Sequence, residues 1–289
     1  MPDWSSINHH LEDEGIHLLD DAVPTPVSGG DISAAWRLAT ADGDLFIKTG
    51  PLSAMNMFIA ESEGLSEISN TASIYVPKVI ATGQSKTAVF LALEWLDFEP
   101  ASDAVESRFG EQLADLHRVS KKRFGWHRDN TIGLSPQKNS WCDDWVDFFR
   151  EQRLAFQFQL AAENGFSADL QERGSRLLKR LPIYFDSAVT TPSLLHGDLW
   201  GGNWACCDGR PVIFDPAVYY GDRETDLAMT RLFGGFSEKF YAAYESCWPL
   251  PDGHRERRYL YQLYHVLNHL NLFGSAYLGR ATGLIDKLL

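Results

Sequence analysis

Short runs of alternating or continuous hydrophobic residues dominate the first third of the chain. They lie at 35–38, 45–48, 77–83 and 88–94, and the turn Ala41-Asp42-Gly43 separates the first two. Such runs bounded by turn residues are typical of strands joined in hairpins. Between the second and third runs, residues 53–69 carry apolar side chains at helical spacing. We therefore expect a small antiparallel sheet with one helix.

The pattern becomes helical after residue 98. Apolar residues recur at spacings of three and four, which predicts helices over 103–119, 141–163, 166–181 and 255–273. The predicted fold is α+β with two lobes. Residues 1–97 form a small lobe with the antiparallel sheet and its helix, and residues 98–289 form a larger, mainly helical lobe. The stretch Glu94-Trp95-Leu96-Asp97 marks the boundary between them.

One polar cluster carries the strongest chemical signal. His196-Gly197-Asp198 followed by Asn203 fits the H-x-D-x-x-x-x-N pattern of a kinase catalytic loop, and a short strand-like run then leads to Asp215. Phosphoryl transfer needs positioned charge more than covalent help from the protein. Asp198 is therefore the predicted base, and Asn203 and Asp215 are the predicted Mg²⁺ ligands. The alternative is that these are ordinary loop residues flanking a hairpin.

The first lobe offers matching nucleotide contacts. Lys48 ends a strand, as the phosphate-binding lysine of kinases does, and Glu61 on the following helix is its expected partner, with Glu63 as the alternative. Gly29 and Gly30 form a candidate phosphate loop, although two adjacent glycines also suit a simple turn. In a two-lobed kinase, the backbone of Glu94 and Leu96 would bind adenine; otherwise this stretch is a linker.

Composition limits the possible partners and location. The chain has 289 residues, of which 44% are hydrophobic and 22% charged, and its net charge is -13. This acidity argues against nucleic acid as a partner. We see neither a membrane-length apolar run nor a signal peptide, so we expect a cytoplasmic protein without membrane attachment. The four cysteines show no C-x-x-C spacing, so they are expected to be free thiols rather than zinc ligands.

Polar residues also recur within the predicted helices. Tyr264, His265, Asn268 and His269 form a stripe on the last long helix, which could face a sugar pocket or hold buried core histidines. His117 is expected to be structural. Asp226 is expected to brace the catalytic loop by accepting backbone hydrogen bonds.

The motifs resemble the fructosamine kinase family, a branch of the aminoglycoside-phosphotransferase and choline-kinase-like fold. The resemblance rests on Leu195-His196-Gly197-Asp198-Leu199-Trp200-Gly201-Gly202-Asn203, Phe214-Asp215-Pro216-Ala217 and Tyr220-Gly221-Asp222-Arg223-Glu224. It extends over most of the chain. The Leu-Trp-Gly-Gly-Asn continuation is far more specific than the H-x-D motif alone.

The resemblance implies a bilobal protein-kinase-like fold and ATP- and Mg²⁺-dependent phosphorylation of the 3-hydroxyl of a ketosamine. Asp198 would then be the base, Lys48 and Glu61 the nucleotide clamp, and Trp200 a neighbour of the acceptor. Many members have a cysteine directly after the paired glycines, where this chain has Asp31. That difference argues against the redox-sensitive dimerisation associated with the cysteine.

The expected acceptors are small ketosamines, such as fructosamine or ribulosamine adducts, or glycated proteins undergoing deglycation repair. We expect a monomer or a weak dimer. The alternative enzyme is a small-molecule kinase of the aminoglycoside or choline type, and a third reading is a pseudokinase. Leu199-Trp200-Gly201-Gly202 favours the ketosamine kinase, and intact Lys48, Asp198, Asn203 and Asp215 argue against a pseudokinase.

Overall fold

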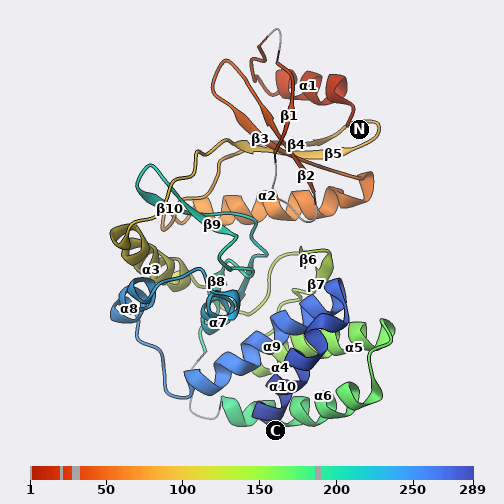
Figure 1. The fold of residues 1–289 in the computed structure, drawn as a ribbon, viewed down its shortest axis with the longest axis vertical. Coiled ribbons are helices and arrows are strands. Elements are labelled where there is room, and N and C mark those ends of the chain that lie inside the picture. The colour runs from red at the N-terminus through yellow and green to blue at the C-terminus, as the bar shows by residue number, and fades with distance from the viewer. Residues whose placement is uncertain (1, 20–21, 28–32, 186–189) are drawn as a thin grey trace. The chain divides into compact units, whose positions relative to one another are not determined.

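The computed structural model describes residues 2–19, 22–27, 33–185 and 190–289. The chain divides into two compact units (Figure 1). The first comprises residues 1–101 together with 205–215, and the second comprises 102–204 and 216–289. The predicted glycine loop, Gly29-Gly30, lies outside the described residues, as does Asp31.

The first unit is built on a five-stranded antiparallel sheet with strand order β1-β2-β3-β5-β4. Its strands are β1 Thr25–Val27, β2 Ala34–Leu38, β3 Leu45–Gly50, β4 Val79–Gln84 and β5 Val89–Glu94. Four of them match the apolar runs of the sequence. The predicted antiparallel sheet is therefore confirmed.

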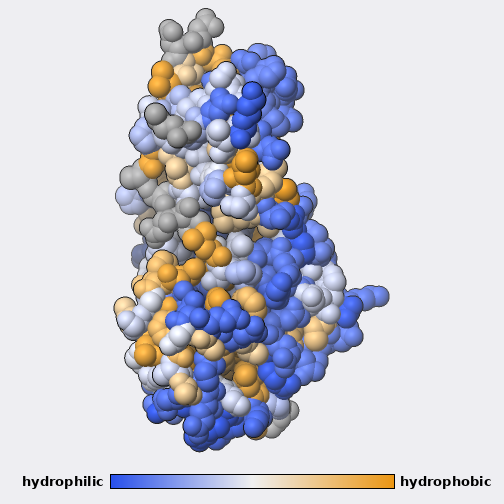
Figure 2. Space-filling model, turned by 90° about the vertical axis from the view of Figure 1, so that its right-hand side faces the viewer, coloured by the Kyte–Doolittle hydropathy of each residue, from blue (hydrophilic) through white to orange (hydrophobic). Residues whose placement is uncertain are grey.

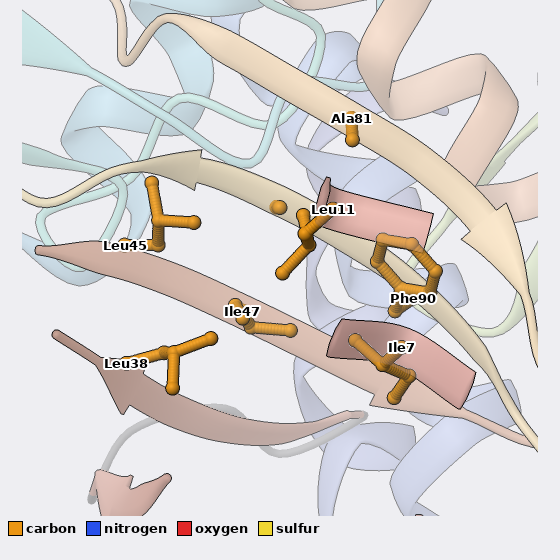
Figure 3. Close-up of a cluster of buried hydrophobic side chains, with 8 residues drawn as sticks. Ile7, Leu11, Leu38, Leu45, Ile47, Ala81 and Phe90 are labelled. Carbon is orange, nitrogen blue, oxygen red and sulfur yellow. The ribbon is translucent and has the colours of Figure 1, made fainter. Parts of the chain in front are cut away.

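Two helices cover opposite faces of this sheet, α1 (Trp4–Asp13) on one and α2 (Met55–Ser69) on the other (Figure 1). Figure 3 shows Ile7 and Leu11 of α1 against inward-facing residues of the strands, among them Ile47 and Phe90. Side chains alternate between the faces of a strand, so Lys48 points toward the opposite face from Ile47. The sheet thus directs Lys48 to the α2 side.

A hairpin from late in the chain belongs to the first unit. Strands β9 (Trp204–Cys207) and β10 (Arg210–Ile213) form it. The Ile213 amide donates to the Tyr75 carbonyl at 3.0 Å, and the Glu99 amide donates to the Cys206 carbonyl at 3.0 Å. This differs from the sequence-based division, in which all residues after 97 belong to the second lobe. Chain order alone does not show that the hairpin packs on residues from the first third of the chain.

The second unit is mainly helical. Its helices are α3 Asp103–Arg118, α4 Trp145–Phe149, α5 Phe156–Glu163, α6 Ala168–Arg180, α7 Glu224–Phe233, α8 Glu238–Cys247, α9 His254–Phe273 and α10 Leu278–Leu288. Two short antiparallel pairs accompany them, β6 (Asn130–Ile132) with β7 (Ser135–Gln137) and β8 (Ser193–Leu195) with β11 (Tyr219–Gly221). The predicted helix over 141–163 is interrupted by a π-helical segment at Arg150–Ala155.

On the face shown in Figure 2, hydrophobic residues form scattered patches among hydrophilic ones. Within the described part of the chain, no helix combines the length and the apolar character needed to cross a bilayer.

Candidate active site

Three charged side chains meet in the first unit. Lys48 Nζ donates to Glu61 Oε1 and to Asp215 Oδ1, in both cases at 2.6 Å. They come from β3, from α2 and from the segment directly after β10. The structure thus pairs Lys48 with Glu61, the favoured one of the two predicted glutamates.

This trio stabilises the charged form of the lysine. Burial alone would lower the pKa of Lys48, but the carboxylates of Asp215 and Glu61 outweigh it and raise the pKa above its usual range. The Lys48 side chain is only 10% exposed, whereas that of Asp215 is 43% exposed. The arrangement therefore holds a permanent positive charge beside a carboxylate that solvent reaches.

Asp215 also has an uncommon backbone conformation. Its φ of 58° lies in the left-handed region, which non-glycine residues adopt rarely and Asp and Asn tolerate best. The turn brings the carboxylate back to Lys48 directly after the strand ends. An aspartate at this position therefore does two things: it tolerates the left-handed backbone, and it places a carboxylate beside Lys48.

The boundary stretch has part of its backbone already paired. The Glu94 amide donates to the Lys78 carbonyl at 2.9 Å and the Trp95 amide to the Asp44 carbonyl at 3.2 Å. The Glu94 carboxylate accepts from the Tyr75 hydroxyl and the Lys78 amide. These two amides already donate to carbonyls within the fold. Any hydrogen bonds from this stretch to adenine would therefore come from the Glu94 carbonyl and from Leu96.

In the second unit, buried Asp226 holds the start of the predicted catalytic loop, residues 196–203. Its two carboxylate oxygens accept from the amides of His196 at 2.8 Å and Gly197 at 2.9 Å, and His117 Nε2 lies 3.2 Å from Oδ2. The structure therefore gives Asp226 the bracing contacts that the sequence predicted. Burial lowers the pKa of His117, although the Asp226 carboxylate opposes it.

Gly197 is required by the geometry of this loop. Its φ is +84°, and a Cβ there would lie 2.0 Å from the Ala217 carbonyl oxygen. A side chain would clash with backbone, which cannot move aside as a flexible side chain can. The glycine in the H-G-D motif thus permits a close approach of residues 196–198 to the segment after Asp215.

Asp198 and Asn203 are linked by a tight turn. Asn203 Nδ2 donates to the Asp198 carbonyl at 2.9 Å, and the Asn203 amide donates to the Trp200 carbonyl at 2.9 Å. The side-chain nitrogen of Asn203 is thus engaged, which leaves its side-chain oxygen, Oδ1, to coordinate a cation. Amide and carboxylate oxygens are the hard ligands that Mg²⁺ takes together with phosphate oxygens.

The residues present therefore fit Mg²⁺ delivered with a nucleotide better than a metal held by protein alone. No cluster of three or more His, Cys, Asp or Glu side chains suited to a metal occurs in the described ranges. Asn203 and Asp215 stay the predicted ligands.

Trp200 lies at one end of a series of aromatic side chains that contact one another in the second unit. Its ring is 40% exposed and meets Phe233 edge-on, with ring centroids 6.5 Å apart. Phe233 contacts His269 at 4.9 Å. The Trp200 ring covers Gly202, where a Cβ would lie 2.3 Å from it. The structure thus connects two of the four predicted acceptor residues through Phe233, which the sequence analysis did not single out.

The other two predicted acceptor residues are buried. Asn268 accepts from Gln157 Nε2 at 3.3 Å and donates to the Ile132 carbonyl at 3.4 Å. His265 is fully buried, and burial lowers its pKa to about 3. Substrate contact by His265 and Asn268 stays a prediction, one that this burial does not favour.

Comparisons with known proteins show the family of this chain. The profile of the fructosamine kinase family matches residues 3–289. A Vibrio parahaemolyticus protein named probable ketoamine kinase is 40% identical over 288 residues, covering 99% of each chain.

Two solved structures extend the likeness to the fold. A Haemophilus somnus protein named as a fructosamine-3-kinase superposes with a TM-score of 0.88 and 30% identity, covering 99% of this chain and 97% of that one. An ADP-bound aminoglycoside phosphotransferase superposes with a TM-score of 0.65 and 15% identity, covering 99% and 97%, which shows a shared protein-kinase-like fold. The chain therefore belongs to the fructosamine kinase family, which confirms the predicted resemblance, the predicted fold and the predicted kinase class.

Proposed function

We propose that the protein transfers the terminal phosphoryl group of ATP to the 3-hydroxyl of a ketosamine and releases ADP. Family membership and the names of the similar proteins support this reaction. The structural observation that carries it is the position of Lys48, 2.6 Å from both Glu61 and Asp215. A lysine clamped in this way is the phosphate-binding group of kinases.

The first unit supplies the nucleotide contacts in this proposal. Glu61 orients Lys48 so that its ammonium group neutralises charge on the phosphates. The Glu94 carbonyl and Leu96 amide would bind the adenine edge, and Gly29-Gly30 would approach the phosphates. The pairing of the Glu94 and Trp95 amides within the fold supports this choice of backbone atoms.

The second unit supplies the base. Asp198 accepts the proton of the acceptor hydroxyl as that oxygen attacks the terminal phosphorus and the bond to the leaving ADP oxygen breaks. Asn203 and Asp215 would hold Mg²⁺, which neutralises phosphate charge when bound. Asp226 keeps the loop in place through the His196 and Gly197 amides.

The acceptor is proposed to lie beside Trp200 and His269. An exposed indole offers an apolar face for a sugar ring, and the neighbouring imidazole offers a hydrogen bond. The ketosamine would be a free metabolite or an adduct on a protein lysine, and its 3-phosphate is unstable, which would remove the adduct. We further propose a cytoplasmic monomer or weak dimer.

A panel of acceptors tests the proposed reaction. ADP release would be followed with fructosyl-lysine, ribulosyl-lysine, kanamycin, choline and buffer alone. The proposal expects turnover on the ketosamines only, and their ranking identifies the preferred sugar. Turnover on kanamycin or choline instead would establish the alternative small-molecule kinase. Nucleotide binding without turnover on any acceptor would favour a pseudokinase.

A further inference from the structure

A buried amide network joins the β6–β7 hairpin to the segment that follows Asp215. Gln137, 1% exposed at the end of β7, donates from Nε2 to Asn130 Oδ1 at 2.8 Å and to the Ala217 carbonyl at 3.0 Å. Asn130 in turn donates from Nδ2 to the Val218 carbonyl at 2.8 Å. Two consecutive carbonyls, directly after Asp215-Pro216, are thus held by side chains of one hairpin.

The same segment touches the catalytic loop. The Ala217 amide donates to the His196 carbonyl at 2.8 Å. The Ala217 carbonyl oxygen lies so close to Gly197 that a Cβ there would be 2.0 Å from it. Gln137 therefore holds the carbonyl of a residue that contacts both residues preceding Asp198, Gly197 through its carbonyl and His196 through its amide.

The side-chain oxygen of Gln137 is hydrogen-bonded as well. Tyr264 on α9 donates its hydroxyl to Gln137 Oε1 at 2.7 Å, and β7 lies beside α9 in Figure 1. Burial raises the pKa of this hydroxyl, Arg153 opposes the rise, and Asp198 adds to it. Tyr264 therefore stays a neutral donor at ordinary pH.

A buried arginine anchors the far side of the network. Arg153, 0% exposed, lies on the π-helical segment and donates from Nη2 to Asn139 Oδ1 at 2.7 Å. Asn139 Nδ2 donates to Asn130 Oδ1 at 2.8 Å. Because every amide in the chain from Arg153 to Ala217 is engaged, each O and N orientation is fixed by its neighbour. Three side-chain amides engaged in this way favour one arrangement of the backbone that they hold.

We propose that Gln137 is a positioning residue for phosphoryl transfer, which sets the catalytic loop through the Ala217 carbonyl with the help of Tyr264. This inference rests on the proposed kinase function. If the Gln137 amide served stability alone, its removal would lower the free energy of unfolding and leave kcat unchanged. Gln137 instead holds backbone in contact with His196 and Gly197, so its loss displaces the base.

The substitution Gln137→Met tests this role. Methionine has a similar length and lacks the amide, so the Ala217 carbonyl loses its donor. With fructosyl-lysine and ATP saturating, kcat should fall about 10- to 100-fold, because small displacements of a catalytic group are costly. The dissociation constant of ATP should stay within about threefold, because Lys48 and Glu61 are untouched.

Gln262→Met is the matched control. Gln262 is also buried and donates from Nε2 to a main-chain carbonyl, that of Ala228, at 3.1 Å. Thermal unfolding would be measured for both variants. The proposal expects the control to lose a comparable amount of stability while it keeps kcat within about twofold. An equal loss of kcat in both variants would overturn the proposal, because Gln137 would then act no differently from a structural residue.

The single variant Tyr264→Phe covers the case in which Gln137→Met does not fold. Tyr264→Phe removes only the hydroxyl and should lower kcat several-fold, about three- to tenfold. If Gln137→Met folds, the double variant should be no slower than Gln137→Met alone, because both act through one network. Wild-type kcat in Tyr264→Phe, or multiplicative losses in the double variant, would overturn the proposal. An inactive wild type would instead refute the proposed function itself.

Discussion

Lys48 and Asp215 stand 167 residues apart in the sequence, yet Lys48 Nζ donates to Asp215 Oδ1 at 2.6 Å. The contact exists because the β9–β10 hairpin packs in the first unit and delivers Asp215 to the face of β3 that carries Lys48. Removal of the Lys48 charge would take this ion pair away from Asp215, whereas removal of the Asp215 charge would leave Lys48 paired with Glu61 alone. The predicted phosphate-binding cation and a predicted metal ligand are thus one electrostatic unit, and this relationship makes the roles of both residues testable.

Asp215→Asn separates the charge of this residue from its backbone conformation. Asparagine tolerates a φ near 58° as well as aspartate does, so the turn should persist. We expect kcat/KM to fall about 100-fold, with half-maximal activity shifted to higher Mg²⁺, because a carboxylate ligand is lost. A Mg²⁺ titration of activity and of ATP binding checks this. Asp208→Asn, at the exposed hairpin turn, is the control, and identical Mg²⁺ curves for Asp215→Asn and wild type would remove Asp215 from the ligand set.

Asp198→Asn should abolish proton acceptance without disturbing the nucleotide clamp. The loop backbone is held through the Asp226 contacts and the Asn203 bond to the Asp198 carbonyl, and the substitution retains all of them. We expect kcat to fall about 10²- to 10⁴-fold and ATP affinity to stay near the wild-type value. Single-turnover kinetics and nucleotide titration measure the two effects separately. Turnover close to wild type would refute Asp198 as the base.

Trp200→Ala tests the acceptor assignment. Trp200 is 40% exposed, so its removal should cost less stability than removal of a fully buried aromatic residue would. We expect KM for the ketosamine to rise about two- to tenfold, the size of a lost aromatic contact, with KM for ATP unchanged. Ile183→Ala, which truncates another exposed hydrophobic side chain of the second unit, should alter neither. A rise in KM for ATP alone would place Trp200 outside the acceptor site.

His265 makes stability depend on pH. The folded pKa is about 3, below the unfolded value of 6.5, so the unfolded chain binds a proton that the folded chain excludes. Its contribution is therefore constant above pH 6.5 and becomes destabilising as the pH falls below it. At pH 5.5 the loss relative to pH 8 should be on the order of 1 kcal/mol.

Denaturant unfolding of wild type and His265→Leu at pH 8 and 5.5 measures this difference. The variant should lack this part of the pH dependence and should keep KM for the ketosamine. Equal pH dependence in both proteins would show that His265 is not an isolated buried imidazole. A large rise in KM would restore its predicted substrate role.

Local patterns predicted much of this molecule. Alternation identified the strands around Lys48, and the spacing from His196 to Asn203 predicted a catalytic loop, the backbone of which Asp226 is found to hold. These features depend on residues close in sequence. The Gln137 network was missed because amides carry no periodic signal, and its partners lie at 130, 217 and 264.

Burial was the second difficulty for sequence analysis. Four residues on α9 shared one polar stripe, but only the folded helix shows that His265 is buried while His269 joins the aromatic contacts. Helical spacing places residues on one side of a helix without showing what packs against that side. The exposed partner of Trp200, Phe233, was missed for the same reason.

The position of the transferred phosphate tests the central claim most directly. Wild-type protein would be incubated with ATP, Mg²⁺ and fructosyl-lysine, and the product examined at once by phosphorus–proton correlation NMR, with Asp198→Asn as the control. The account predicts coupling between the new phosphate and the proton on carbon 3, absent in the control. Phosphate on another carbon, or ADP formed without any phosphorylated ketosamine, would contradict the account.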